Sequence, residues 1–151
     1  ERSRLDHHYP ELGETLADAL LRPHRCYYND LKPLLQPPTP ALSGAEGSGL
    51  QPPLHGIAHI TGGGIPGNLP RILPQGLGAR VDRSAWRVPP VFRLIQSQGR
   101  IEDGEMYRAF NMGLGLVLAV APEHADAVRS KLAGSFICGE VVPGKGVEWA
   151  T

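Results

Sequence analysis

The stretch AHITGGGIPGNLPRILP, residues 58–74, places three consecutive glycines between a run typical of a β-strand and a proline-containing segment typical of a short helix. Glycine adopts positive φ without a steric penalty and lets the backbone approach another group closely. The glycines therefore admit two interpretations. They make a tight strand-to-helix turn, or they let successive N–H groups converge on an anion such as phosphate. The sequence alone leaves both open.

The same segment matches the dinucleotide-binding pattern G-x-G-x-x-G through Gly62, Gly64 and Gly67. Asp82 follows at the end of the next predicted strand, where such proteins place an acidic residue. The match fails at the helix, which is only about six residues long and contains Pro70, too short to carry a parallel crossover. A second proline also removes a backbone donor from the turn. We therefore reject a dinucleotide site.

Outward from the glycines, hydrophobic patterning predicts short strands and helices in alternation. Strands are predicted over residues 56–61, 77–82, 114–121, 135–142 and 146–150, the last two joined as a hairpin by the turn PGKG. Helices are predicted over 16–21 with Thr15 as cap, at the end of 26–35, over 68–73 with Asn68 as cap, and over 89–99, 103–111 and 122–134. This order predicts an α/β (α+β) sandwich, with a mixed sheet covered by helices.

Composition predicts three regions in the chain. Residues 1–13 are polar and predict a linker, and residues 14–151 predict one globular domain. Within it, residues 36–53 are rich in Pro, Gly and Ser and predict a mobile surface loop. The chain does not begin with Met, so we interpret it as a fragment or a processed product.

Charge and hydropathy argue against nucleic acid and membranes as partners. Lys plus Arg number 15 and Asp plus Glu also number 15, so the balance predicts no general attraction to nucleic acid or to an anionic membrane. No apolar stretch approaches the roughly 20 residues that a membrane-spanning helix needs. Cys26 and Cys138 are far apart in sequence, and with no targeting signal they predict two buried free thiols in a cytoplasmic protein.

Two groups of polar residues accompany the predicted turns. His59, Thr61 and Arg71 surround the glycine turn, and a histidine is suited to moving protons near neutral pH. The second group lies in EMYRAFNMGLGL, residues 105–116, where Glu105 and Arg108 share a predicted helix face and can pair with each other. Asn111 in the same stretch either ends that helix or contributes to a site.

Three segments together resemble a known family. LADALLRPHRCYY, GIAHITGGGIPGNLPRILP and EMYRAFNMGLGL, in this order, resemble the C-terminal half of aminoimidazole ribonucleotide synthetase, also called phosphoribosylformylglycinamidine cyclo-ligase. The likeness runs from about residue 13 to the end of the chain. Two departures stand out: His24 occupies a position where Thr is frequent in the family, and residues 36–53 are longer and richer in proline.

The resemblance implies an ATP-dependent ligase of purine biosynthesis that closes the imidazole ring of aminoimidazole ribonucleotide. It also implies that ATP, Mg²⁺ and formylglycinamidine ribonucleotide bind between two domains and that the N-terminal domain carries the metal ligands and forms a homodimer. This chain alone is then expected to be inactive. The alternatives are a non-catalytic ligand-binding module and another ATP-dependent member of the superfamily, such as formylglycinamidine ribonucleotide synthetase.

Site residues follow from the motifs that carry the resemblance. His59 is expected to be catalytic, although it can also serve only to orient the glycine turn. We expect no metal ligand within this chain. The residues expected to bind substrate or phosphate are Thr61, Gly62, Gly63, Gly64, Asn68, Arg71, Arg108 and Asn111.

Overall fold

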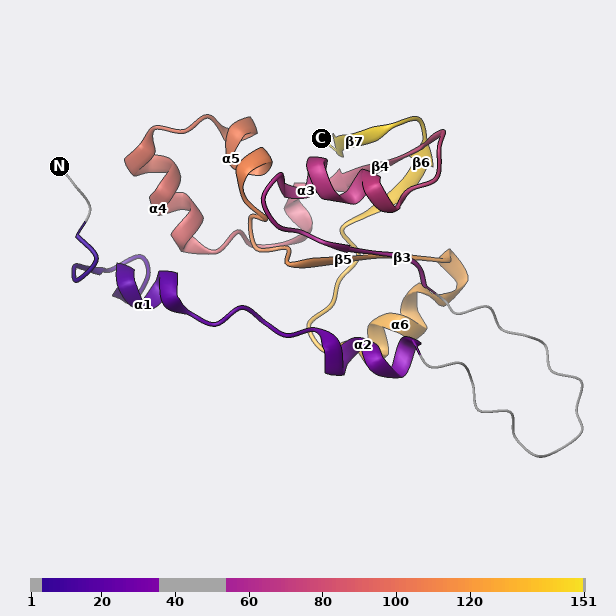
Figure 1. Ribbon diagram of the computed structural model, residues 1–151, viewed down its shortest axis with the longest axis horizontal. Helices are drawn as coiled ribbons and strands as arrows, with labels where there is room; N and C mark the ends of the chain where they lie inside the picture. The colour runs from indigo at the N-terminus through magenta and orange to yellow at the C-terminus, as the bar shows by residue number, and fades with distance from the viewer. Residues whose placement is uncertain (1–3, 36–53, 151) are drawn as a thin grey trace, which may run out of the picture.

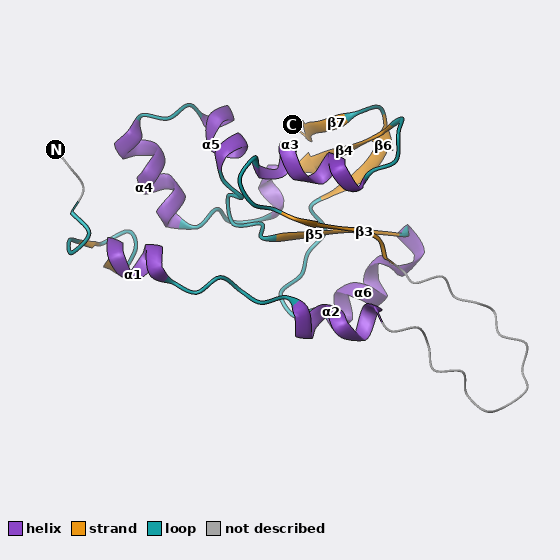
Figure 2. Cartoon of the chain, viewed as in Figure 1, coloured by secondary structure: helices purple, strands orange, loops and turns teal. Residues whose placement is uncertain are grey.

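The computed structural model describes residues 4–35 and 54–150 (Figures 1 and 2). Its first elements are β1 (His8–Tyr9), β2 (Glu14–Thr15), α1 (Leu16–Leu21), α2 (Tyr28–Leu35), β3 (Leu54–His59), α3 (Gly64–Asn68), η1 (Leu69–Ile72) and β4 (Leu77–Asp82). Those that follow are η2 (Arg83–Ala85), α4 (Pro90–Gly99), α5 (Asp103–Ala109), β5 (Leu116–Val120), η3 (Pro122–His124), α6 (Ala125–Lys131), β6 (Gly139–Pro143) and β7 (Gly146–Ala150). The predicted α+β class is confirmed.

A two-stranded antiparallel ribbon of β3 and β5 crosses the middle of the molecule (Figure 1). Its register pairs His59 with Leu116 at one end and Leu54 with Val120 at the other. Helices α2 and α6 lie side by side against one face of the ribbon, while α3 and the remaining large sheet lie on the opposite side. The ribbon therefore has two buried faces, and every residue of β5 is partly buried rather than fully enclosed.

The apolar side chains of β5 contribute to a hydrophobic cluster on each face of the ribbon, because successive side chains of a strand point to opposite faces. Leu116, Leu118 and Val120 join the cluster formed by α2 and α6. Val117 joins the other cluster, whose buried members are Ala58, Ile60, Ile65, Leu69, Ala79, Val81 and Leu114. The glycine turn after β3 therefore leads directly into the second cluster through α3.

The second sheet has three strands in the order β6-β4-β7. β4 pairs antiparallel with β6 and parallel with β7, which makes the sheet mixed as predicted. The predicted hairpin between residues 135–142 and 146–150 is wrong, because β4 lies between β6 and β7 and pairs with both. The turn at residues 143–146 thus crosses over the end of β4 instead of joining two neighbouring strands.

A third cluster fills the space between α4 and α5. Met106 is fully buried there, and Tyr107 and Met112 are nearly so. Trp86 fixes the chain at this point, since its indole N–H donates to the carbonyl of Met112. Met112 itself has φ of 52° and Gly113 has φ of 100°, so the chain turns sharply into β5. This turn brings the second predicted polar group to the same side of the fold as α3.

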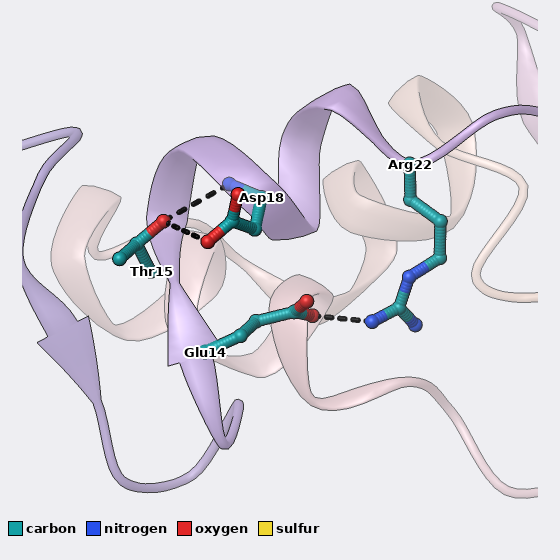
Figure 3. A network of polar contacts seen from close by, with 4 residues as sticks. All are labelled: Glu14, Thr15, Asp18 and Arg22. Carbon is teal, nitrogen blue, oxygen red and sulfur yellow. Dashed lines mark hydrogen bonds and ion pairs between the residues drawn. The ribbon is translucent and has the colours of Figure 1, made fainter.

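Near the N-terminus, the predicted linker contains a small hairpin in which β1 pairs with β2. Thr15 caps α1 as predicted: its hydroxyl oxygen accepts from the Asp18 N–H at 3.1 Å (Figure 3). Glu14 forms an ion pair with Arg22, which ties β2 to the end of α1. The domain boundary at residue 13 stays a prediction, and the loop predicted over 36–53 lies outside the described residues.

Two further predictions have clear outcomes in the described residues. No helix within 4–35 and 54–150 has the length and hydropathy to cross a membrane. Both cysteines are free thiols, but Cys26 is exposed, so the prediction that both are buried is wrong for that residue. Cys138 is partly buried, and this burial raises the pKa of its thiol.

Candidate functional site

The fold constrains the three glycines that follow β3 in different ways. Gly63 has φ of 96° and Gly64 has φ of 59°, both in the region that glycine favours. Gly64 also lies against α5, where an added Cβ would lie 1.9 Å from the carbonyl oxygen of Tyr107. Gly62 has neither constraint: its φ is not positive, and nothing lies within 4 Å of an added Cβ. The fold therefore explains two of the three glycines and leaves Gly62 unexplained.

Some backbone N–H groups at this turn have hydrogen-bond acceptors within the fold, and others do not. The Gly64 N–H donates to the carbonyl of Thr61, and the Gly67 N–H donates to that of Gly63. For the N–H groups of Gly62 and Gly63, no acceptor is found among residues 4–35 and 54–150. Thr61, Gly62 and Gly63 are also exposed. Two adjacent N–H groups of exposed residues thus have no acceptor within the described part of the chain, next to the end of β3.

Asn68 stabilises the turn from inside the molecule. Its side chain is buried, and its amide nitrogen donates to the carbonyls of Thr61, Gly62 and Gly64 at 3.4, 3.2 and 2.8 Å. Asn68 occupies the N-cap position of η1, as predicted, but its side chain makes no capping hydrogen bond, and a helical segment already begins at Gly64. Asn68 instead holds the carbonyls of this turn from the buried side.

His59 ends β3 immediately before the turn and is exposed. Its Nε2 lies 3.1 Å from Nε2 of His24, which belongs to the segment between α1 and α2. His24 in turn packs edge-on against the ring of Tyr27. Sequence reasoning noted His24 only as a departure from the family pattern, and that departure was the one available signal for this contact.

The second predicted polar group has mixed outcomes. Arg108 is exposed on α5 and forms the predicted local ion pair with Glu105 at 3.6 Å. Asn111 uses its side-chain oxygen to accept from the Gly113 N–H at 3.0 Å, so it shapes the turn into β5. Arg71 is exposed on η1 and takes part in none of the side-chain hydrogen bonds or ion pairs among the described residues.

An open groove lies beside the second polar group, and Arg108 is the one predicted site residue in its lining. It has a volume of about 630 Å³ and is lined by Pro66, Glu102, Gly104, Glu105, Tyr107, Arg108, Val147 and Trp149. Beside it, the Arg83 guanidinium lies over the rings of Tyr107 and Trp149 at 4.6 and 4.5 Å from their centroids. Burial raises the pKa of Tyr107 and outweighs the opposite effect of Arg83. Sequence patterning missed this stack, because its members come from three separate elements.

Comparison with known proteins shows which family the chain belongs to. The model of the family "AIR synthase related protein, C-terminal domain" matches residues 5–150. The chain belongs to this family. The predicted resemblance to the C-terminal half of the synthetase is thereby confirmed.

Individual relatives agree with the family match. The chain is 46% identical over 137 residues to the phosphoribosylformylglycinamidine cyclo-ligase of Desulfitobacterium hafniense, covering 88% of this chain and 36% of the relative. Proteins of the same name from Enterococcus faecalis and Pseudothermotoga lettingae are 44% and 38% identical, with 90% and 97% of this chain and 36% and 40% of the relative covered. The chain therefore spans little more than a third of the length of these relatives.

Within this AIR synthase C-terminal domain, the described residues contain no group of three or more His, Cys, Asp or Glu side chains suited to hold a metal ion. The features that remain for ligand contact are backbone donors, His59 and the exposed arginines. This donor set suits a phosphorylated, oxygen-rich ligand, since backbone N–H groups and guanidinium groups both bind phosphate oxygens.

Proposed function

We propose that this domain is the C-terminal part of an ATP-dependent cyclo-ligase that converts formylglycinamidine ribonucleotide to aminoimidazole ribonucleotide in purine biosynthesis. The observation that carries the proposal is the family match over residues 5–150, with relatives named phosphoribosylformylglycinamidine cyclo-ligase at up to 46% identity. The open backbone donors of Gly62 and Gly63 support it, because ring closure passes through a phosphorylated substrate.

The proposed reaction has two steps. ATP supplies the phosphoryl group that activates the amide oxygen of the substrate, and ADP leaves. The amidine nitrogen then forms a bond to the activated carbon, the C–O bond breaks, and phosphate leaves with the transferred oxygen. The ring nitrogen must also lose a proton. The second step therefore needs donors for the departing phosphate and an acceptor for that proton.

Residues of this chain match both needs. The N–H groups of Gly62 and Gly63 would donate to phosphate oxygens, with Thr61 beside them and Asn68 holding the turn. Preorganised donors of this kind stabilise developing charge without reorganisation. His59, at the end of β3, would accept the proton. Arg71 and Arg108 would neutralise phosphate charge from η1 and α5, and Asn111 would mainly support the turn into β5.

The remaining parts of the proposal concern the longer protein. Mg²⁺ would arrive with ATP and be held mainly by residues outside this chain, in an N-terminal domain that also forms a homodimer. The protein would act in the cytoplasm, on small molecules, without nucleic acid or membrane partners. Each of these points rests on the family and not on a contact within residues 4–35 and 54–150.

A direct assay tests the function. The full-length protein would be incubated with formylglycinamidine ribonucleotide, ATP and Mg²⁺, and aminoimidazole ribonucleotide and ADP would be measured together. We expect equal amounts of both products. ATP turnover without a cyclised product would point to another ATP-dependent member of the superfamily. Substrate binding without turnover would leave the domain as a ligand-binding module.

A further inference from the structure

His24 and His59 come from distant parts of the chain, and their contact restricts the protons on both rings. The two Nε2 atoms lie 3.1 Å apart. A neutral imidazole carries one N–H donor and one acceptor nitrogen. This contact therefore requires a proton on one Nε2 and a lone pair on the other, so the two rings must hold opposite tautomers. With its Nε2 occupied, His59 has Nδ1 as the nitrogen available to a ligand.

The position of His24 is fixed by packing as well as by this hydrogen bond. Tyr27 enters a space that exists because residue 115 has no side chain: a Cβ on Gly115 would lie 2.1 Å from the Tyr27 hydroxyl oxygen and 3.4 Å from Cε1 of His24. The rings of His24 and Tyr27 pack edge to face, with centroids 5.8 Å apart. Gly115 is also tied to β3, because its carbonyl accepts from the Ile60 N–H.

We propose that His24 is a positioning residue for His59, and this proposal rests on the proposed role of His59 in proton transfer. The His24 Nε2 lone pair accepts from Nε2–H of His59. This holds His59 in the Nε2–H tautomer and leaves a lone pair on its Nδ1. Nδ1 then takes the proton that the ring nitrogen loses on cyclisation, and the resulting imidazolium keeps its hydrogen bond to His24. A base oriented by a third group in this way is a recurring catalytic arrangement.

The first test reads the tautomer itself. Long-range ¹H–¹⁵N correlation spectra would be recorded on the full-length protein with ¹⁵N-labelled histidine, well above the usual histidine pKa, with signals assigned through His24→Asn and His59→Gln. We expect His59 in the Nε2–H form in the native protein and a mixture of tautomers in His24→Asn, where the shorter amide does not reach His59. An Nδ1–H form of His59, or no change in His24→Asn, would overturn the proposal.

The second test compares two matched variants in the cyclisation assay. His24→Gln keeps an amide at the reach of Nε2, whereas His24→Asn is one methylene shorter. We expect His24→Asn to lower kcat about tenfold, part of the 10²–10⁴ that general base catalysis contributes, with little change in KM, and His24→Gln to recover most of the rate. Equal rates in the two variants would contradict the positioning role. His55→Ala, at an exposed residue of the same strand, is the control and should retain full activity.

The two tests separate this inference from the proposed function. If the full-length protein makes no aminoimidazole ribonucleotide, the function fails, while the spectra still decide whether His24 sets the tautomer of His59. If the protein is active but the tautomer and the rates do not respond to His24, only the inference fails.

Discussion

Gly62, Gly63 and Gly64 show how neighbouring identical residues can have unrelated roles. Gly64 is required by its positive φ and by its contact with α5, and Gly63 by its positive φ alone. Gly62 is exposed and meets no atom that a methyl group would disturb. Among the described residues, the neighbouring Gly63 N–H has no acceptor, so Gly62 is the position at which to test close approach of a ligand.

The first prediction therefore compares Gly62→Ala with Gly64→Ala in the full-length protein. Gly62→Ala should leave the melting temperature nearly unchanged, because its Cβ meets no other atom. Alanine keeps the backbone N–H, but its methyl group would block close approach of the phosphate, so the cyclisation rate should fall by about one to three orders of magnitude, the scale for losing one preorganised donor contact. Gly64→Ala should lower the free energy of unfolding by at least about 2 kcal/mol through overpacking against α5. Full activity in a folded Gly62→Ala protein would eliminate the proposed phosphate contact at this residue.

The second prediction concerns Asn68, whose amide holds three carbonyls of the glycine turn. Asn68→Asp keeps the shape of the side chain but removes its donors and sets an acceptor against those carbonyls. We expect a loss of about 2–3 kcal/mol in the free energy of unfolding, as for a buried polar group that loses its partners. Urea unfolding measures it, with the exposed Asn29→Asp as control. An unchanged midpoint would mean that the turn holds without this amide.

The third prediction uses the two free thiols. Burial raises the pKa of Cys138, so a smaller fraction of it is thiolate at neutral pH, and thiolate is the reactive form. Cys26 is exposed and should react with maleimide first. Mass spectrometry of the labelled native protein should find the label on Cys26 until urea exposes Cys138. Equal labelling of both cysteines in the native state would contradict the described packing of Cys138.

At the scale of elements, the molecule is assembled from short pieces that gain stability from one another. α1 has six residues, and its packing contacts are chiefly with β2. Helices this short are marginal in water, so local interactions decide whether they persist. The Thr15 cap and the ion pair between Glu14 and Arg22 are two such interactions (Figure 3).

The fourth prediction follows from that cap. Thr15→Ala removes the oxygen that accepts from the Asp18 N–H and should destabilise α1 by about 1 kcal/mol. Hydrogen exchange of the amides in 16–21 should become faster, while exchange in β4 stays the same because that strand lies in the other part of the fold. Thr15→Ser keeps the oxygen and should restore protection. Unchanged exchange in Thr15→Ala would show that the cap contributes nothing.

At the scale of the whole molecule, the chain corresponds to little more than a third of its relatives. Within the described residues there is no cluster of metal ligands and no acceptor for the N–H groups of Gly62 and Gly63. We therefore expect the proposed chemistry to need residues outside this chain that position ATP.

The fifth prediction is that this chain alone does not cyclise formylglycinamidine ribonucleotide. Phosphoryl transfer depends on positioning the nucleotide and its metal ion, which a single wall of the site does not achieve. The assay is the same measurement of aminoimidazole ribonucleotide, with the full-length protein as positive control. Product formation by residues 1–151 alone would contradict both the expected inactivity and the proposal that the metal ligands lie outside this chain.

The amino-acid sequence by itself determined the features that depend on local chemistry. β4 lies at the predicted residues 77–82, because alternating side chains and flanking turn residues specify a strand locally. The Thr15 cap and the Glu105–Arg108 pair were also predictable, since each involves residues three positions apart. The family followed from the order of three motifs.

Only the tertiary structure decided the features that depend on partners distant in the chain. Residues 139–143 and 146–150 carry hairpin chemistry, yet β4 separates the two strands because both pair with it. Asn68 is a residue type typical of a helix N-cap. In the fold, its side-chain amide instead donates to the carbonyl of Gly64, where the first helical segment begins. His24 contacts His59 although 35 positions separate them, and Tyr27 packs beside His24 in the space left by Gly115. Local sequence patterns do not predict such contacts, because the contacts join residues that are far apart in the chain and form only when it folds.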